Sequence, residues 1–172
     1  MKRPLLLLLA LLVFVGALLA CGGTSSNTGT TSSGNSTPPP AQSQHFKVGE
    51  AVKVGNTWEV TVNSVKTNNG SEYLKPKDGK TYLVVNVTTK NLTSQEQNMS
   101  SILNFSLKDT TGQKADIAII PNVDVAPNGK VEAGGLLRGN LAYEVPKSEK
   151  KFTLSFQNNI LSGGQTLWDL SI

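Results

Sequence analysis

Cysteine and histidine are almost absent from this 172-residue chain, in which Cys21 and His45 are the only examples of their types. A single cysteine excludes an intramolecular disulfide framework and a cysteine-rich zinc site. A single histidine restricts any Ser–His or Cys–His catalytic pair to His45. We interpret His45 as an exposed residue at a domain edge, and we expect no metal, no cofactor and no enzymatic activity.

Clusters of charge are also scarce. Sixteen Lys and Arg residues face 12 Asp and Glu residues, and two of the positive charges, Lys2 and Arg3, lie at the very start of the chain. Nucleic-acid binding requires clustered basic residues, often with aromatic residues among them. The densest basic run, "KSEKK" at 147–151, includes a glutamate and is typical of a solvated turn. We therefore expect no nucleic-acid partner.

The N-terminal 20 residues have the layout of a bacterial secretory signal. Lys2 and Arg3 provide a positive end, residues 5–15 are uninterruptedly apolar, and residues 16–20 are small or apolar. The apolar stretch 5–20 is shorter than the roughly 20 residues that span a bilayer as a helix. The pattern predicts a signal peptide over 1–20.

The segment "LLAC" at 18–21 resembles the lipobox of bacterial lipoproteins. The resemblance implies that the Cys21 thiol receives a diacylglycerol group and that the chain is cleaved after Ala20. Two acyl chains give stable anchoring, because each buried CH₂ contributes about 0.8 kcal/mol and one chain holds only marginally. The expected place is the outer face of the cytoplasmic membrane, or an outer membrane if the cell has one. An uncleaved anchor and ordinary secretion are the alternatives.

A polar segment separates Cys21 from the rest of the chain. Residues 22–44 read "GGTSSNTGTTSSGNSTPPPAQSQ", without a charge, an aromatic or a large aliphatic side chain. Such a composition cannot bury enough apolar surface to offset chain entropy. We predict a disordered tether over 21–44, and a folded domain over 45–172.

The remainder of the chain alternates between apolar and polar residues with a period of two, which indicates strands with one buried face. Turn-forming segments separate these runs, among them "VGN" at 54–56, "PKDGK" at 76–80 and "PNGK" at 127–130. No stretch carries a helical stripe. Short strands without helices favour a two-sheet sandwich or a small barrel. The positions predicted to be buried are Trp58, Val60 and Val62; Leu83, Val85 and Val87; Leu103, Phe105 and Leu107; Leu141, Tyr143 and Val145; Phe152, Leu154 and Phe156; and Trp168, Leu170 and Ile172.

Four segments in this part of the chain resemble a known family in their order and spacing. They are "FKVGEAVKVGNTWEVTVNSVK" (46–66), "PKDGKTYLVVNVTTKNLTS" (76–94), "FSLKDTTGQKAD" (105–116) and "GNLAYEVPKSEKKFTLSF" (139–156). The family consists of immunoglobulin-like domains of unknown function, common in lipoproteins and exported proteins of Gram-positive and related bacteria. It is similar in fold to a secreted immunogenic β-sandwich protein of mycobacteria. The resemblance implies an all-β, immunoglobulin-like antiparallel β-sandwich, and it implies no catalytic or binding residue.

Two groups of side chains are candidates for a site. Asp109, Asp116 and Asp124 faintly suggest a calcium loop, but the EF-hand pattern of acids is absent, and a hairpin turn with solvated acids is the favoured interpretation. Aromatic residues could line a ligand groove, although aromatic residues on strands usually pack in a core. These residues are Trp58, Trp168, Tyr73, Tyr82 and Tyr143.

These observations favour a non-catalytic, monomeric binding or scaffolding module of the cell envelope. Its partners would be the membrane, through the lipid on Cys21, and an unknown protein or cell-wall component. A structural or envelope-stress protein without a dedicated ligand is the alternative. A metal-dependent hydrolase is a remote one, because no group of acids is singled out by the sequence.

Overall fold

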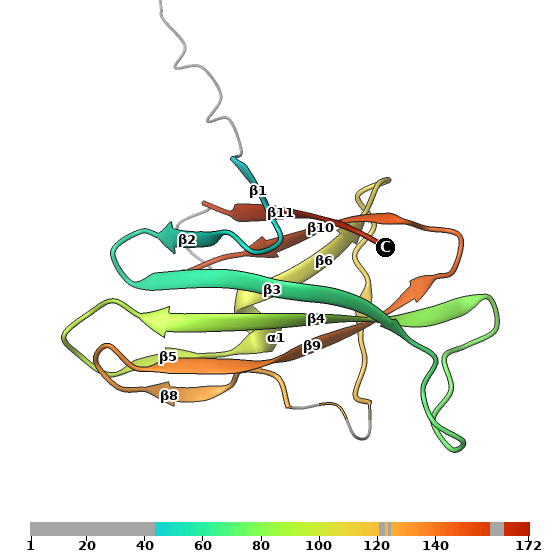
Figure 1. Ribbon diagram of the computed structural model, residues 1–172, viewed down its shortest axis with the longest axis horizontal. Helices are drawn as coiled ribbons and strands as arrows, with labels where there is room; N and C mark the ends of the chain where they lie inside the picture. The colour runs from blue at the N-terminus through green and yellow to red at the C-terminus, as the bar shows by residue number, and fades with distance from the viewer. Residues whose placement is uncertain (1–43, 121–122, 124, 159–163) are drawn as a thin grey trace, which may run out of the picture. The chain divides into compact units, whose positions relative to one another are not determined.

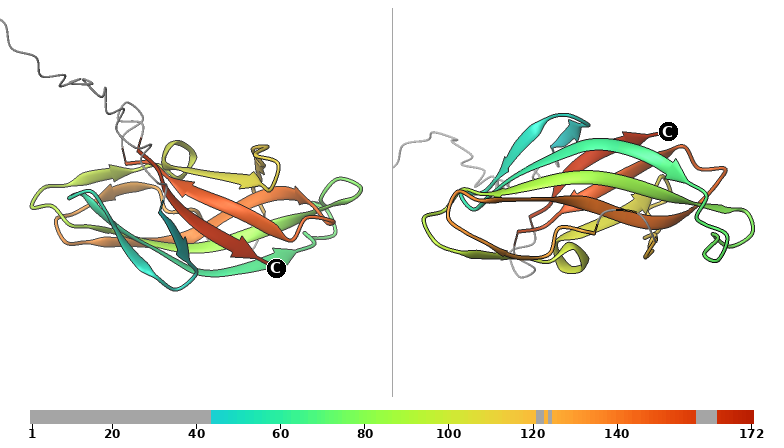
Figure 2. Two further views of the ribbon diagram at one scale, coloured as in Figure 1. Left: turned by 90° about the horizontal axis from the view of Figure 1, so that it is seen from above. Right: turned by 60° about the horizontal axis from the view of Figure 1, so that its bottom comes forward.

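Two β-sheets pack face to face in the computed structural model, which describes residues 44–120, 123, 125–158 and 164–172 (Figures 1 and 2). The predicted signal peptide, Cys21 and the tether up to residue 43 lie outside the described residues. One sheet has four strands in the order β1 (His45–Lys47), β11 (Thr166–Ser171), β10 (Lys151–Phe156) and β6 (Phe105–Asp109). The other has five, in the order β2 (Ala51–Val54), β3 (Trp58–Asn68), β4 (Lys80–Asn91), β9 (Leu136–Pro146) and β7 (Asp116–Ile117).

Three short elements lie outside the two main sheets. β5 (Gln97–Met99) pairs with β8 (Gly129–Val131), and α1 (Ser101–Asn104) leads directly into β6. No helix among the described residues is long and apolar enough to cross a bilayer. The all-β sandwich predicted from the sequence is therefore confirmed.

The core lies between the inner faces of the two sheets, as the alternating pattern predicts. Val60, Val62 and Leu154 are fully buried, and Trp168 fills the centre of the four-stranded sheet without exposure. The alternating apolar residues of most predicted strands thus point inward. The two sheets bury these side chains without any disulfide.

Two of the predicted core positions are wrong. Leu103 is 60% exposed, because Ser101–Asn104 forms one helical turn and the strand begins only at Phe105. Ile172 is 37% exposed, because β11 ends at Ser171. The helical turn was not predicted, since four residues are too few to show a periodic stripe.

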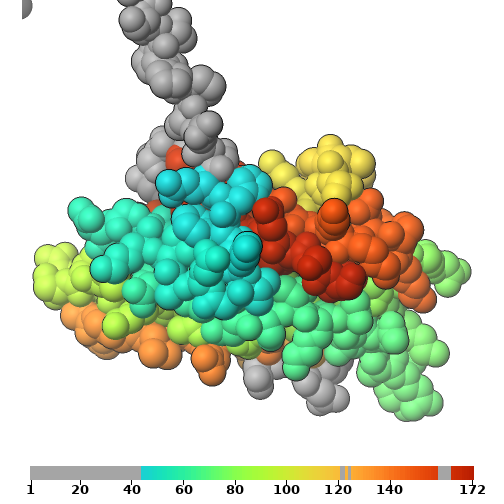
Figure 3. Space-filling model, turned by 45° about the horizontal axis from the view of Figure 1, so that its top comes forward, coloured from blue at the N-terminus to red at the C-terminus, as the bar shows by residue number. Residues whose placement is uncertain are grey.

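The first and the last described strands lie side by side. β1 pairs with β11 in parallel, while the other strand pairs in the two main sheets are antiparallel. Phe46 packs on Trp168 with ring centroids 6.1 Å apart. Figure 3 shows the cyan N-terminal strands against the red C-terminal strand on this face. The predicted tether would therefore join the domain at one edge of the four-stranded sheet.

A buried asparagine connects β4 to the crossover that follows it. Asn91 is fully buried, and its Nδ2 donates to the carbonyl oxygens of Gln95 at 2.7 Å, Val131 at 3.0 Å and Glu132 at 3.0 Å. Its Oδ1 accepts from the backbone and the hydroxyl of Thr93. This side chain satisfies backbone groups where the ladder ends, which fixes the β4–β5 connection against the β8 side of the molecule.

Candidate functional site

An apolar pocket of about 380 Å³ opens at the β9 edge of the five-stranded sheet, between that edge and α1. We call it the isoleucine pocket. Its size falls within the range of small-molecule sites, which is about 300–1,000 Å³. Its lining comprises Ser101, Ile102, residues 117–120, Val123, Val125, Ala126, Asn128 and residues 140–143.

The pocket exists because the chain leaves the edge of β9 and returns to it. The Ala118 amide donates to the Ala142 carbonyl at 2.8 Å, and the Asn140 amide donates to the Val125 carbonyl at 3.3 Å. β7 itself ends at Ile117. A local interruption of edge pairing therefore leaves room for a ligand.

The inner wall of the isoleucine pocket is buried and its rim is exposed. Leu141 and Tyr143 belong to the main core, whereas Ile120 and Ala142 form a smaller cluster with Tyr82 and Val84 on the outer side of the sheet. At the rim, the exposed fractions are 64% for Ile102, 87% for Ile119 and 82% for Val125. Grouped exposed aliphatic side chains around a cavity are typical of an interaction site.

Among the residues that the structure describes, no charged side chain lines the pocket. The Oδ1 of Asn128 accepts from the backbone amide and the hydroxyl of Ser101, at 2.7 and 3.0 Å. The Oδ1 of Asn140 accepts from Asn86 at 2.8 Å. The ionisable lining residue is Tyr143, and burial raises the pKa of its hydroxyl well above the usual range. The described lining is therefore suited to a mainly apolar group.

Two of the predicted acidic candidates, Asp109 and Asp116, line one small hollow of about 160 Å³ together with Glu144. The Asp109 carboxylate accepts from the Thr111 hydroxyl at 2.6 Å and from the Thr111 and Gln113 amides at 2.9 Å, and these bonds lower its pKa. Asp116 of β7 pairs with Glu144 of β9, and Asp124 is outside the described residues. Within the described ranges, no three His, Cys, Asp or Glu side chains form a metal-ligating group. Asp109 thus stabilises a hairpin turn.

His45 has a partner that the sequence does not reveal. Its Nδ1 lies 2.7 Å from Oδ1 of Asp169, a residue 124 positions later. Both side chains are exposed, with exposed fractions of 43% and 63%. The contact follows from the parallel pairing of β1 with β11 and lies at the domain edge where His45 was expected.

The aromatic candidates were predicted to pack in the core, and three of the five do only that. Trp58, Trp168 and Tyr82 are buried, whereas Tyr73 is 92% exposed in the β3–β4 connection. Tyr143 is buried and also lines the isoleucine pocket. The aliphatic lining was missed altogether. A usable signal was the run "IAII" at 117–120, which is apolar without alternation between two turn segments.

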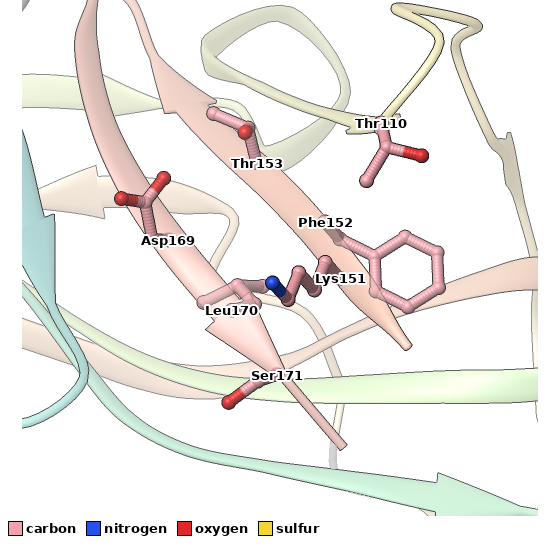
Figure 4. A pocket seen from close by; sticks show the side chains of 7 residues that line it. All are labelled: Thr110, Lys151, Phe152, Thr153, Asp169, Leu170 and Ser171. Atoms are coloured by element: carbon pink, nitrogen blue, oxygen red, sulfur yellow. The ribbon is translucent and has the colours of Figure 1, made fainter. Parts of the chain in front are cut away.

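A second hollow of about 420 Å³ lies over β10 and β11 near the β6 hairpin (Figure 4). Its lining includes Lys151, Asp169, Thr153 and Ser171. In Figure 4 these polar groups are spread along the two strands instead of converging on one point. The isoleucine pocket is the better candidate, because its walls are apolar and its inner side is buried.

A family model matches residues 46–166, and its description is the domain of unknown function DUF4352. The chain belongs to this family. The match covers almost the whole of the sandwich, so the family resemblance found in the sequence is confirmed. No curated protein matches the sequence significantly.

Solved structures confirm the fold. The yjhA protein of Bacillus subtilis has a TM-score of 0.61 and 23% identity, over 73% of this chain and 99% of that one. A proposed lipoprotein of the same species, ycdA, has a TM-score of 0.59 and 20% identity, over 69% of this chain and 38% of that one. The chain thus spans little more than a third of ycdA. The secreted protein MPT63 of Mycobacterium tuberculosis has a TM-score of 0.53 and 13% identity, over 77% and 99%.

Proposed function

We propose that this DUF4352 chain is a non-catalytic binding module of the cell envelope, and that the isoleucine pocket is its ligand site. The observation that carries the proposal is the pocket itself, which combines a buried apolar wall with three exposed aliphatic rim residues, and whose described lining has no charged side chain. Covering one such side chain contributes about 1.5–3 kcal/mol. Covering Ile102, Ile119 and Val125 would therefore favour the binding of an apolar ligand.

The chemistry of the pocket supports a binding role over a catalytic one. Acid–base catalysis requires a group that exchanges a proton near the working pH. Among the described lining residues the ionisable one is Tyr143, whose hydroxyl is protonated at neutral pH, and burial raises its pKa further. The described lining can hold an apolar group.

The second part of the proposal is that a lipid on Cys21 holds the module at the outer face of the cytoplasmic membrane. The lipobox-like "LLAC" segment and the polar tether support it. Intact-mass measurement of the protein from the membrane fraction tests it. We expect the mass of residues 21–172 plus acyl chains, and no acyl mass in a Cys21→Ser variant. An unacylated mass with a different start would overturn this part.

The pocket is tested with N-phenyl-1-naphthylamine, a neutral dye whose fluorescence rises in apolar sites. The Cys21→Ser full chain is the protein used, because it carries no acyl group of its own on residue 21. We expect saturable binding that an Ile119→Asp or Val125→Asp variant weakens at least tenfold. Both positions are more than four-fifths exposed, so these substitutions should leave the fold intact.

Tyr73→Asp is the matched control, because Tyr73 is 92% exposed and does not line the pocket. It introduces the same charge elsewhere on the surface. Absence of saturable dye binding, or an equal loss in the Tyr73 variant, would refute the isoleucine pocket as the ligand site.

A further inference from the structure

Five polar side chains form one continuous hydrogen-bond network across β3, β4 and β9, which lie side by side in the five-stranded sheet (Figure 1). Asn63 Nδ2 donates to Asn86 Oδ1 and to Thr88 Oγ1, both at 2.9 Å. Asn86 Nδ2 donates to Asn140 Oδ1 at 2.8 Å, and Arg138 Nε donates to Thr88 Oγ1 at 3.1 Å. We call these five residues the polar network. They are exposed or half-buried, so the network lies at the surface of the sheet.

A β-bulge forms the centre of the polar network. The pairing of β3 with β4 shifts between Val62 and Ser64, so that Asn63 has no residue opposite it. A bulge re-aims a side chain, and bulges are over-represented next to active sites. Here Asn63 bonds to Asn86 and Thr88, which are two positions apart on one face of β4. Asn63 therefore holds Thr88, and Thr88 in turn orients the guanidinium of Arg138.

The unpaired groups of the polar network are mostly hydrogen-bond donors. Thr88 Oγ1 already accepts two hydrogen bonds, which leaves its own hydrogen for a third group. Among the described residues, no acceptor binds the terminal nitrogens of Arg138 or the Nδ2 of Asn140. A surplus of donors beside a cation favours an anionic ligand with several oxygen atoms.

The charges around Arg138 also favour an anion. Arg138 makes no ion pair with any residue that the structure describes. On the neighbouring strand β4, the nearest charge to its partner Thr88 is the positive Lys90, and such diagonal neighbours are about 7–8 Å apart. Glu59 lies opposite Lys90 on β3, two strand spacings or roughly 10 Å from β9. A ligand with two negative charges therefore matches the two cations.

The type of residue at position 138 points to a particular geometry. Arg138 is the sole arginine after Arg3, and lysine supplies the other positive side chains of the sandwich apart from His45. A guanidinium offers parallel N–H groups that bind two oxygens of one phosphate, whereas an ammonium acts as a point charge. A phosphate monoester carries a charge of about −1.5 to −2 at neutral pH, while a carboxylate carries one.

We propose that Arg138 binds the phosphate group of a soluble phosphate monoester on this face of the sheet, with Thr88 as the positioning residue. The terminal nitrogens of Arg138 donate to two phosphate oxygens, and Lys90 supplies the second positive charge. This site is separate from the isoleucine pocket, because neither Arg138 nor Thr88 lines that pocket. It therefore adds a second ligand class and does not depend on the proposed function.

The experiment is a titration of the isotope-labelled Cys21→Ser full chain with methyl phosphate. The NMR signals of the side-chain amides of Asn63, Asn86 and Asn140 report binding, and we expect saturable shifts. Arg138→Lys keeps the charge but loses the paired contact, so it should raise the dissociation constant about fivefold. Acetate should bind at least about fivefold more weakly than methyl phosphate, because it carries less charge.

Two further substitutions test the role of Thr88. Thr88→Val removes the hydroxyl that orients Arg138 and should weaken binding about threefold. Thr88→Ser keeps the hydroxyl and should bind as the unsubstituted position does. In all of these variants the affinity for N-phenyl-1-naphthylamine should stay unchanged, since neither residue lines the isoleucine pocket.

Lys66→Gln is the matched control for Arg138→Gln, because both remove one positive charge from an exposed position of the same sheet. The Lys66 side chain makes no hydrogen bond or ion pair among the described residues. Its loss should change the affinity for methyl phosphate by less than about twofold. Equal losses in the two variants, or unchanged binding in Arg138→Lys, would show a general effect of charge and overturn the site.

Two other results would overturn the ligand class. Acetate that binds as tightly as methyl phosphate would show that the site does not select phosphate. Binding to vesicles that contain phosphatidic acid, without any saturable shift by methyl phosphate, would assign the phosphate to a lipid surface instead of a soluble ester. An absence of both would mean that the polar network is purely structural.

Discussion

Gly139 of β9 lies so close to Val125 that a Cβ on residue 139 would collide with the Val125 carbonyl oxygen. The same Cβ would lie 2.8 Å from the Pro127 backbone nitrogen. The chain returning to the β9 edge therefore crosses directly over a residue without a side chain. This close approach holds Val125 at the rim of the isoleucine pocket.

The Gly139→Ala substitution should disturb both stability and binding. Overpacking at a close backbone contact costs about 1–3 kcal/mol, and here the 125–127 backbone must move. We expect a lower melting temperature together with weaker binding of N-phenyl-1-naphthylamine. Gly164→Ala is the control, because nothing lies within 4 Å of a Cβ at that position. Equal stability of the two variants would show that the rim tolerates displacement.

The Asn91→Ala substitution should destabilise the domain by more than about 2 kcal/mol. It removes a fully buried side chain that donates to three carbonyl oxygens and accepts from Thr93, which leaves backbone groups unpaired. Chemical denaturation measures the change in the free energy of unfolding. Asn98→Ala, at an exposed position of β5, should change it by less than about 0.5 kcal/mol. Similar losses in both variants would contradict the role given to Asn91.

Glu144 should contribute stability that disappears in acid. The Lys77 backbone amide donates to its carboxylate at 2.8 Å, and this bond, with the Lys77 and Lys80 side chains nearby, lowers the pKa of Glu144 below its usual value. A lowered folded-state pKa gives a contribution that is complete above the unfolded-state pKa and is lost as the pH falls through the folded-state pKa. We expect Glu144→Gln to be less stable than wild type at pH 7 and equal to it in strong acid.

Melting temperatures from pH 7 to about pH 2 measure this difference. Glu72→Gln is the comparison, because Glu72 is exposed and makes none of the ion pairs among the described residues. Its difference from wild type should stay small across the range. A pH-independent difference for Glu144→Gln would show that its carboxylate charge is unimportant.

The contact between β1 and β11 should depend on Phe46 more than on His45. Loss of the Phe46 ring removes its packing on Trp168, and Phe46→Ala should cost about 1–2 kcal/mol. The exposed His45–Asp169 pair contributes at most about 1 kcal/mol, so His45→Ala should have the smaller effect. Thermal unfolding compares the two variants. The reverse order would mean that the polar pair, and not the ring contact, holds β1 in place.

Alternation predicted most of the sandwich because burial on one face imposes a period of two. Leu83, Val85 and Val87 show it, and all three are fully buried in β4. The turn glycines were equally informative, and Gly79 has a φ of 75° in the turn before β4. Short elements were not predictable, since β1, β5 and β7 contain two or three residues each, too few for a pattern.

The isoleucine pocket could not be predicted from the sequence, for a different reason. Ile102 and Val125 are far apart along the chain, and they meet because the chain leaves and rejoins the edge of β9. A strand pattern indicates which face is buried, but it does not indicate where an edge strand stops pairing. The His45–Asp169 contact has the same origin, because it depends on which strand lies beside β1. The lipobox prediction on Ala20 and Cys21 stays a prediction, because those residues lie outside the described ranges.

The parallel pairing of β1 with β11 also determines when the four-stranded sheet can form during synthesis. A ribosome releases the N-terminal residues first, yet residues 45–47 find their partners only in residues 167–169. Contacts of such long sequence separation carry a large loop-closure cost and form slowly. The four-stranded sheet is thus completed only after synthesis of β11, and a chain that stops before Trp168 leaves Phe46 without this contact. An unfinished chain would consequently display an aromatic side chain that quality-control proteases can recognise.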